Sequence, residues 1–309
     1  MSDLFCDRLL DAIDQKQAPI CVGIDPILES MPEEIRAKFI SRDDEPQAAV
    51  DAIFDFTAAV LKVVAPHVPI VKFQSAYFEK YLWEGVEAYY SLIQEAKALG
   101  LLVIGDVKRG DIGSTATAYA AGHLAEQTGD DEIATPDAIT VNPMLGLDTL
   151  KPFIDAARDF SRGLFVLVRT SNPGSAELQD VKLETGQTWS EMLAQKLAPL
   201  AADRSLVGTR GFSSIGAVVG ATHPHTIESL RRLLPQSIFL LPGYGVQGAT
   251  ADMTRAAFKN GRGAFVSASR SILYAHADPK YSAQFGKDWR KCVEAALNDM
   301  KRDIQRVIG

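Results

Sequence analysis

The stretch LLVIGDVKRGDIGST, residues 101–115, places a dense cluster of charge directly after an apolar run. Residues 101–104 are apolar at every position, which indicates a strand that is covered on both faces, as in a parallel sheet. Asp106, Lys108, Arg109 and Asp111 follow within six positions. Because active sites in barrels of parallel strands lie at the carboxyl ends of the strands, this stretch indicates both a buried strand and a functional site.

Seven further runs of the same kind predict a sheet of eight strands. They are PICVGID at 19, VPIVKFQ at 68, AITVNP at 138, LFVLVRTS at 164, GAVVGAT at 216, IFLLPGYG at 238 and AFVSASR at 264. Segments with helical periodicity lie between most of them, for example residues 48–64, 87–100 and 189–202. We therefore expect an α/β fold, a closed (β/α)8 TIM barrel. The alternative is a doubly wound nucleotide-binding sheet, but the first run continues as GIDPILES, without a GxGxxG turn.

The domain organisation follows from the uniform composition of the chain. With neither a low-complexity linker nor a shift in composition, we predict that residues 1–309 form a single (β/α)8 barrel domain with an N-terminal helix and a C-terminal helix. Residues 174–187 are polar and unpatterned, which predicts a long loop after the fifth strand and a candidate lid. Trp83, Trp189 and Trp289 lie in helical stretches and are interpreted as packing residues.

Charge and cysteine content narrow the functional classes. Acidic residues outnumber basic ones 39 to 32, and the resulting net charge of -7 argues against nucleic acid or an anionic membrane as a partner. The three cysteines form no CxxC pattern, which favours reduced thiols. The N-terminus resembles no secretory signal, and no apolar stretch approaches the roughly 20 residues of a membrane helix. We expect a cytoplasmic protein.

The carboxyl ends of the predicted strands carry polar residues. In chain order these are Asp25, Lys72, Asp106 with Lys108 and Asp111, Asn142, Ser171, Thr222, the PGYGVQG loop and Arg270. Asp106 and Lys108 are two positions apart, so both face the barrel opening, and Lys72 can join them from the neighbouring strand. Alternating lysine and aspartate side chains stabilise each other's charged forms. We interpret this group as catalytic; the alternative is an ion-pair network that only closes the top of the barrel.

The last two strand ends predict a phosphate site. LLPGYGVQGA (240–249) and SASRSI (267–272) follow the seventh and eighth strands, where barrels commonly bind phosphate through backbone N–H groups and one cation. Arg270 is the strongly basic residue placed for this role, although PGYG could instead be only a tight turn. His223 and His225 lack a nearby acid or cysteine, so no metal site is predicted.

Taken together, these segments resemble the orotidine 5′-phosphate decarboxylase family, in its longer bacterial branch. The shared segments are GIDP (23–26), VKFQ (71–74), DVKRGDIGST (106–115), TSNPG (170–174), VVGAT (218–222), PGYGVQG (242–248) and SRSI (269–272). The DxKRGD pattern on the third strand is hard to obtain by chance. The resemblance implies decarboxylation of orotidine 5′-monophosphate (OMP) to uridine 5′-monophosphate (UMP), the last step of de novo pyrimidine synthesis. It also implies no metal or organic cofactor, and a homodimer with shared active sites.

The resemblance implies roles for the charged residues. Lys72, Asp106, Lys108 and Asp111 match the alternating tetrad of the family, in which Asp111 comes from the partner subunit. Lys108 matches the group that protonates C6 after CO₂ leaves, and Asp106 matches the group against the departing carboxylate. Asp25 and Lys72 match the groups that hold ribose hydroxyls.

Further positions match substrate-binding residues of the family. Ile112 and Thr115 would reach across the dimer interface into the neighbouring site. Ser171 matches the serine that recognises the pyrimidine, Gln247 the residue that bridges base and phosphate, and Arg270 the phosphate-binding arginine.

One position departs from the pattern, since Ser269 stands where a glycine is common before the arginine. Two other functions remain open. A metal-dependent sugar-phosphate decarboxylase of the same suprafamily shares the DxKxxD core, although the TSNPG and PGYGVQG segments favour a nucleotide. A noncatalytic nucleotide-binding barrel keeps the phosphate residues but has no need for the complete tetrad.

Overall fold

A computed structural model describes residues 4–39, 46–125 and 133–308. Its eight parallel strands follow one another around a closed barrel, and β8 pairs with β1. The strands are β1 (Ile20–Ile24), β2 (Ile70–Gln74), β3 (Leu102–Arg109), β4 (Ala138–Val141), β5 (Gly163–Arg169), β6 (Ser213–Val219), β7 (Ser237–Pro242) and β8 (Ala264–Ala268). Each apolar run of the sequence overlaps one of these strands, so the predicted (β/α)8 barrel is confirmed.

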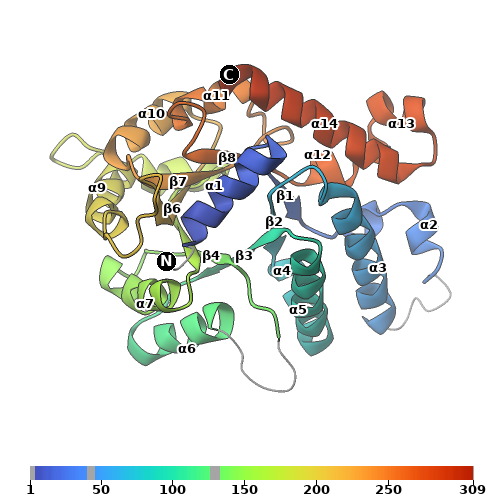
Figure 1. The fold of residues 1–309 in the computed structure, drawn as a ribbon, viewed down its shortest axis with the longest axis horizontal. Helices are drawn as coiled ribbons and strands as arrows, with labels where there is room; N and C mark the ends of the chain where they lie inside the picture. Colours follow the sequence, from blue (N-terminus) through green and yellow to red (C-terminus); the bar gives the residue numbers. More distant parts are fainter. Residues whose placement is uncertain (1–3, 40–45, 126–132, 309) are drawn as a thin grey trace.

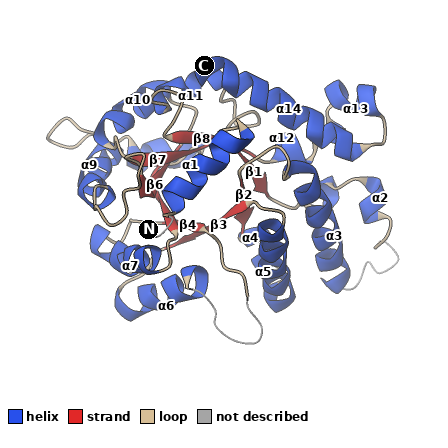
Figure 2. Ribbon diagram, in the orientation of Figure 1, coloured by secondary structure: helices blue, strands red, loops and turns tan. Residues whose placement is uncertain are grey.

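Helices surround the barrel, as Figure 2 shows. They are α1 (Phe5–Lys16), α2 (Glu33–Arg36), α3 (Pro46–Val64), α4 (Ala76–Glu79), α5 (Leu82–Ala98), α6 (Gly113–Leu124), α7 (Lys151–Asp159), α8 (Ala176–Gln179), α9 (Trp189–Ala201), α10 (Pro224–Leu233), α11 (Ala251–Thr254), α12 (Arg270–Leu273), α13 (Pro279–Phe285) and α14 (Trp289–Ile308). Local signals fix their ends. At α9, Thr188 and Glu191 each accept a hydrogen bond from the other's backbone N–H, which is a capping box. No helix in the described ranges is long and apolar enough to span a membrane.

The amino end of the barrel is covered by α1, which lies across the strands in Figure 1. Its apolar face, including Phe5, Leu9 and Ile13, is buried against side chains of the barrel interior. The rings of Phe5 and Phe165 meet edge to face with their centroids 6.0 Å apart. Because aromatic and aliphatic side chains fill this end of the barrel, the polar strand ends at the opposite end are left to form the site.

Two sequence-based expectations differ from the structure. Residues 173–175 form a 3₁₀ helix and α8 follows directly, so the prediction of an irregular loop over 174–187 was wrong at its start. Trp289 is buried, as expected of a packing residue, and Trp189 packs partly buried against the core, but Trp83 is 70% exposed at the start of α5. An aromatic residue in a helix can lie on the buried face or on the exposed face, and its presence in a helical stretch does not determine which.

Candidate active site

A cavity of about 420 Å³ opens at the carboxyl ends of the strands. This volume lies within the usual range for sites that bind small molecules. The predicted site residues that line it are Asp25, Lys72, Asp106, Lys108, Ser171, Gln247 and Arg270. The barrel therefore brings together side chains from the ends of β1, β2, β3, β5, β7 and β8.

Asp106 lies between the two lysines on the floor of the cavity. Its Oδ2 accepts a hydrogen bond from Lys72 Nζ at 2.6 Å, and its Oδ1 accepts one from Lys108 Nζ at 2.7 Å. Burial alone would raise the pKa of Asp106, but the charges of Lys72 and Lys108 hold that pKa well below its usual range. Burial alone would lower the pKa of Lys72, yet Asp106 and then Asp25 raise it above its usual value. The pair is therefore ionised at neutral pH.

Two neutral residues that the sequence analysis missed complete the surroundings of Asp106. Thr140, on β4, donates from Oγ1 to Asp106 Oδ1 at 2.8 Å and accepts from the Lys108 N–H at 2.9 Å. Gln74 donates from Nε2 to Asp106 Oδ2 at 3.1 Å. A signal for Gln74 was present, because it lies two positions after Lys72 on one strand and so shares its face. Thr140 carries no such signal beyond its place in a strand.

The backbone at Lys108 is irregular. Its φ of 45° lies in the left-handed region, which residues other than glycine seldom adopt. The pairing of β3 with β4 shifts register between Gly105 and Arg109, so Lys108 leaves the regular ladder. The expected position of Lys108 at the cavity is correct, but strict alternation along the strand is not the reason for it. Strained backbone of this kind clusters at functional sites.

Asp111, Ile112 and Thr115 do not line the cavity of their own chain. They lie at the start of α6, where the Ile112 N–H donates to Asp111 Oδ1 at 2.7 Å. The Ile112 side chain is 62% exposed. These are the residues for which the family resemblance implies a role in the neighbouring subunit.

The loop after β7 is built for close approach to a ligand. Gly243, Gly245 and Gly248 have φ values of 111°, 78° and 86°, which fold residues 242–248 into a tight turn. Ala249 N–H donates to the Gly243 carbonyl at 3.2 Å and closes the turn. On the adjacent strand end, Arg270 is exposed at the start of α12, and no carboxylate in the described ranges pairs with it. An unpaired cation beside a glycine-rich turn suits an anionic ligand.

Ser269 is accommodated by a glycine on the neighbouring strand. A β-carbon at Gly23 would lie 2.8 Å from the Ser269 β-carbon, so only glycine fits opposite it. Within the described part of the chain, Ser269 Oγ, Asp25 Oδ1 and Thr222 Oγ1 are buried and have no hydrogen-bond partner. Because buried polar atoms are almost always paired, the unpaired atoms of Asp25 and Ser269 at the cavity wall are available to hydrogen-bond a ligand.

Two larger hollows lie on the outer surface. One, of about 770 Å³, lies among α12, α13 and α14, and the other, of about 1130 Å³, lies between α7 and α9. Charged side chains in them pair with one another, as Lys280 does with Asp299 and Arg158 with Asp203. Neither hollow contains a buried ionised pair like that of Lys72 and Asp106, so we assign the site to the cavity at the strand ends.

A closed barrel with ionised side chains gathered at the carboxyl ends of its strands defines a (β/α)8-barrel enzyme. The model of the "Orotidine 5'-phosphate decarboxylase / HUMPS family" matches residues 18–284. The chain belongs to this family.

Individual relatives support the same assignment. A Rhodopirellula baltica protein named orotidine 5′-phosphate decarboxylase is 40% identical over 303 residues, which cover 97% of this chain and 99% of the relative. A Caldicellulosiruptor bescii protein of the same name is 36% identical over 318 residues and 99% of each chain. The structure of Leishmania donovani OMP decarboxylase superimposes with a TM-score of 0.72 at 27% identity, covering 99% of each chain. The resemblance inferred from the motifs is thus confirmed.

Proposed function

We propose that this protein decarboxylates OMP to UMP, the last step of de novo pyrimidine synthesis, and that Lys108 protonates C6. The observation that carries the proposal is the ionised Asp106, held at 2.6 Å by Lys72 and at 2.7 Å by Lys108 on the cavity floor. The names of the relatives from Rhodopirellula baltica and Caldicellulosiruptor bescii support the reaction.

The chemistry explains why a fixed cation is needed. When the bond from C6 to the carboxylate breaks, CO₂ leaves. The electron pair of that bond stays at C6, in the plane of the ring. The π system of the pyrimidine cannot delocalise that pair. The Lys108 ammonium, already held by Asp106, meets the developing charge without reorganising. A proton then moves from Lys108 Nζ to C6, and the lysine regains a proton from solvent. The negative charge of Asp106 beside the substrate carboxylate also disfavours the bound ground state.

The rest of the cavity would bind the unreactive parts of OMP. Arg270 and the turn at 242–248 take the phosphate, and Asp25, with its unpaired Oδ1, accepts from a ribose hydroxyl together with Lys72. Ser171 contacts the base and Gln247 bridges the base and the phosphate, both from the cavity lining. Binding energy from the phosphate, which is remote from C6, is then available to assemble the site around the reacting carbon.

A homodimer would complete each site, with Asp111, Ile112 and Thr115 of one subunit reaching the cavity of the other. Apolar side chains exposed on the segments that follow β2 and β4, the two strands beside β3, support this arrangement. Leu82 and Trp83 at the start of α5 are 73% and 70% exposed. Met144 and Leu145, after β4, are 63% and 57% exposed. Exposed large apolar side chains of this kind suit a surface that another subunit covers.

The activity is tested by following the fall in OMP absorbance in the presence of EDTA. We expect turnover by the natural protein and a loss of at least ~10³-fold in Lys108→Ala, because this variant lacks both the cation and the proton donor. Lys151→Ala, at a side chain that is 75% exposed on α7, is the matched control and should keep full activity. Circular dichroism checks that both variants fold.

Three outcomes would contradict the proposal. Near-normal decarboxylation by Lys108→Ala would remove the assigned role of the lysine. Turnover that EDTA abolishes and a divalent metal restores would favour the metal-dependent sugar-phosphate alternative, and tight UMP binding without CO₂ release would favour a noncatalytic barrel.

A further inference from the structure

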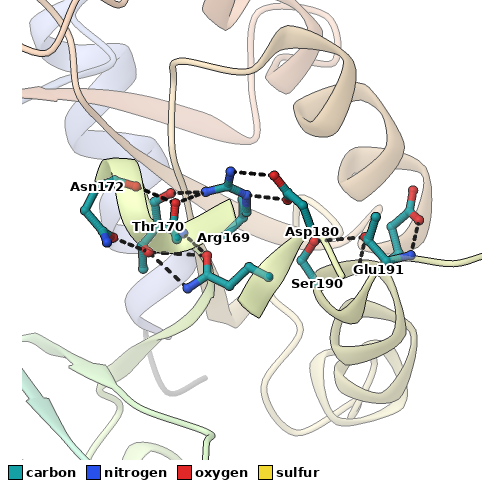
Figure 3. Close-up of polar contacts among 9 residues, drawn as sticks. Arg169, Thr170, Asn172, Asp180, Ser190 and Glu191 are labelled. Atoms are coloured by element: carbon teal, nitrogen blue, oxygen red, sulfur yellow. Dashed lines mark hydrogen bonds and ion pairs between the residues drawn. The ribbon is translucent and has the colours of Figure 1, made fainter. Parts of the chain in front are cut away.

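Arg169, the last residue of β5, is a buried cation outside the Lys72, Asp106 and Lys108 group. It is 1% exposed, and a buried guanidinium is costly unless it is fully paired. Its Nε and Nη2 donate to the two carboxylate oxygens of Asp180 at 2.8 and 2.9 Å, as Figure 3 shows. This two-point contact fixes both the distance and the orientation of Asp180, eleven residues further along the chain.

The remaining guanidinium nitrogen of Arg169, Nη1, contacts the residues that directly follow β5. Nη1 donates to the Thr170 carbonyl at 2.5 Å and also to Ser175 Oγ. Gln179 accepts from the Thr170 N–H at 2.8 Å and donates to its Oγ1 at 3.0 Å. Figure 3 shows Thr170 and Asn172 joined in the same network. We call Arg169, Thr170, Asn172, Ser175, Gln179 and Asp180 the clamp.

Ser171 is the residue that the clamp encloses. Thr170 Oγ1 donates to Asn172 Oδ1 at 2.7 Å, and Ser175 Oγ donates to the Asn172 carbonyl at 2.5 Å, so both neighbours of Ser171 are fixed. On its other side, a β-carbon added at Gly220 would lie 3.0 Å from Ser171 Cα, which leaves little room for movement. The Ser171 backbone is thus held from both sides while its side chain lines the cavity.

We propose that Arg169 and Asp180 are positioning residues that hold Ser171 for recognition of the pyrimidine ring. This inference rests on the proposed function, in which Ser171 contacts the base. Burying the Arg169 guanidinium at the end of β5 costs desolvation free energy, which an apolar residue of the same volume would avoid. What the charge adds is order in residues 170–180, and ordering a loop before the ligand arrives increases affinity.

The test compares two ligands that differ only in the base. Asp180→Asn keeps the shape of a side chain that is 37% exposed but removes the charge that pairs with the buried Arg169, so circular dichroism and thermal unfolding first check that the variant folds. We expect the Kd for UMP to rise about tenfold and the Kd for ribose 5-phosphate to change less than about twofold, because only UMP reaches Ser171. Gln179→Ala, which frees Thr170 from the other side, should act in the same direction. Asp203→Asn, at a carboxylate that is 39% exposed and pairs with Arg158 on the outer surface, should change neither Kd.

A double-mutant cycle separates positioning from a general structural effect. In a Ser171→Ala background, Asp180→Asn should add less than about twofold to the Kd for UMP, because its effect passes through Ser171. Equal weakening of both ligands, or a full effect of Asp180→Asn without Ser171, would overturn the inference. If the natural protein turns over OMP and Asp180→Asn binds UMP normally, the inference alone fails. A natural protein that neither binds UMP nor releases CO₂ overturns the proposed function as well.

Discussion

Asp106 is the residue around which the site is organised. Lys72, Lys108, Gln74 and Thr140 all donate hydrogen bonds to its carboxylate. The two lysines supply the charge that keeps Asp106 ionised, and the two neutral donors fix its plane. A carboxylate that is satisfied on both oxygens cannot rotate freely, so the position of Lys108 Nζ is defined before any ligand binds.

Thr140 provides a prediction at this scale. Its Oγ1 joins the Lys108 N–H to Asp106 Oδ1, at 2.9 and 2.8 Å. Thr140→Val keeps the volume but removes the hydroxyl, so the strained backbone of Lys108 loses its acceptor and Asp106 loses a donor. We expect kcat for OMP to fall by about 10- to 100-fold, with KM within about threefold.

Steady-state kinetics and thermal unfolding of the same samples check this prediction. Thr140→Ser keeps the hydroxyl and should retain most of kcat. A change confined to KM, or a loss of activity that follows only a lower melting temperature, would contradict the assigned role.

The site residues differ in how well they could be predicted from the sequence. Lys72, Asp106 and Lys108 could be predicted because charge at the end of a buried strand is unusual and therefore informative. Gln74 was missed although it shares a face with Lys72, and Thr140 could not be predicted, because neutral polar residues occur in many strands without a role. The φ of Lys108 was also beyond prediction, since a shift of register depends on the neighbouring strand. The roles of Asp111, Ile112 and Thr115 remain predictions.

Among the elements, the turn at 242–248 is tied to the C-terminal helix. Tyr244 lies in this turn, and its hydroxyl donates to Asp303 Oδ2 on α14 at 2.8 Å. Burial, the hydrogen bond to Asp303 and then the Asp303 charge raise the pKa of Tyr244, so the phenol is a hydrogen-bond donor throughout the neutral range. The helix therefore supports the turn that we assign to the phosphate.

Tyr244→Phe tests this link. Without the hydroxyl the turn is less ordered, and we expect KM for OMP and the Kd for ribose 5-phosphate both to rise by about three- to tenfold. The matched control is Tyr281→Phe, whose hydroxyl donates to Asp299 of the same helix at 3.1 Å without lining the cavity. Unchanged affinity for ribose 5-phosphate in Tyr244→Phe would show that α14 does not support the phosphate site.

The elements themselves were predictable to different degrees. The eight strands were recognisable because parallel strands buried on both faces require continuous apolar runs. The helices α3, α5 and α9 were recognisable from their periodicity. The 3₁₀ helix at 173–175 and α8 were missed because both are short and lack an apolar periodicity, and because the ion pair of Arg169 and Asp180 that flanks them joins residues eleven positions apart. Such tertiary contacts leave no local pattern.

For the whole molecule, the exposed apolar side chains after β2 and β4 give a prediction about assembly. Trp83→Asp places a charge in the proposed interface and should dissociate the dimer, which sedimentation velocity measures. Dissociation would remove Asp111 of the other subunit from each cavity. Specific activity should therefore fall with dissociation and recover at high protein concentration. Leu99→Asp, just after the C-terminal end of α5 and 37% exposed, is the matched control. A fully active monomer at nanomolar concentration would exclude shared sites.

The helix α1 closes one end of the barrel and so determines how substrate and product reach the site. Because Phe5 and its neighbours fill the amino end of the barrel, OMP would enter and UMP would leave through the one opening of the cavity, at the end that carries Lys108. We therefore expect UMP to compete with OMP for this one cavity, so that turnover slows as the product accumulates.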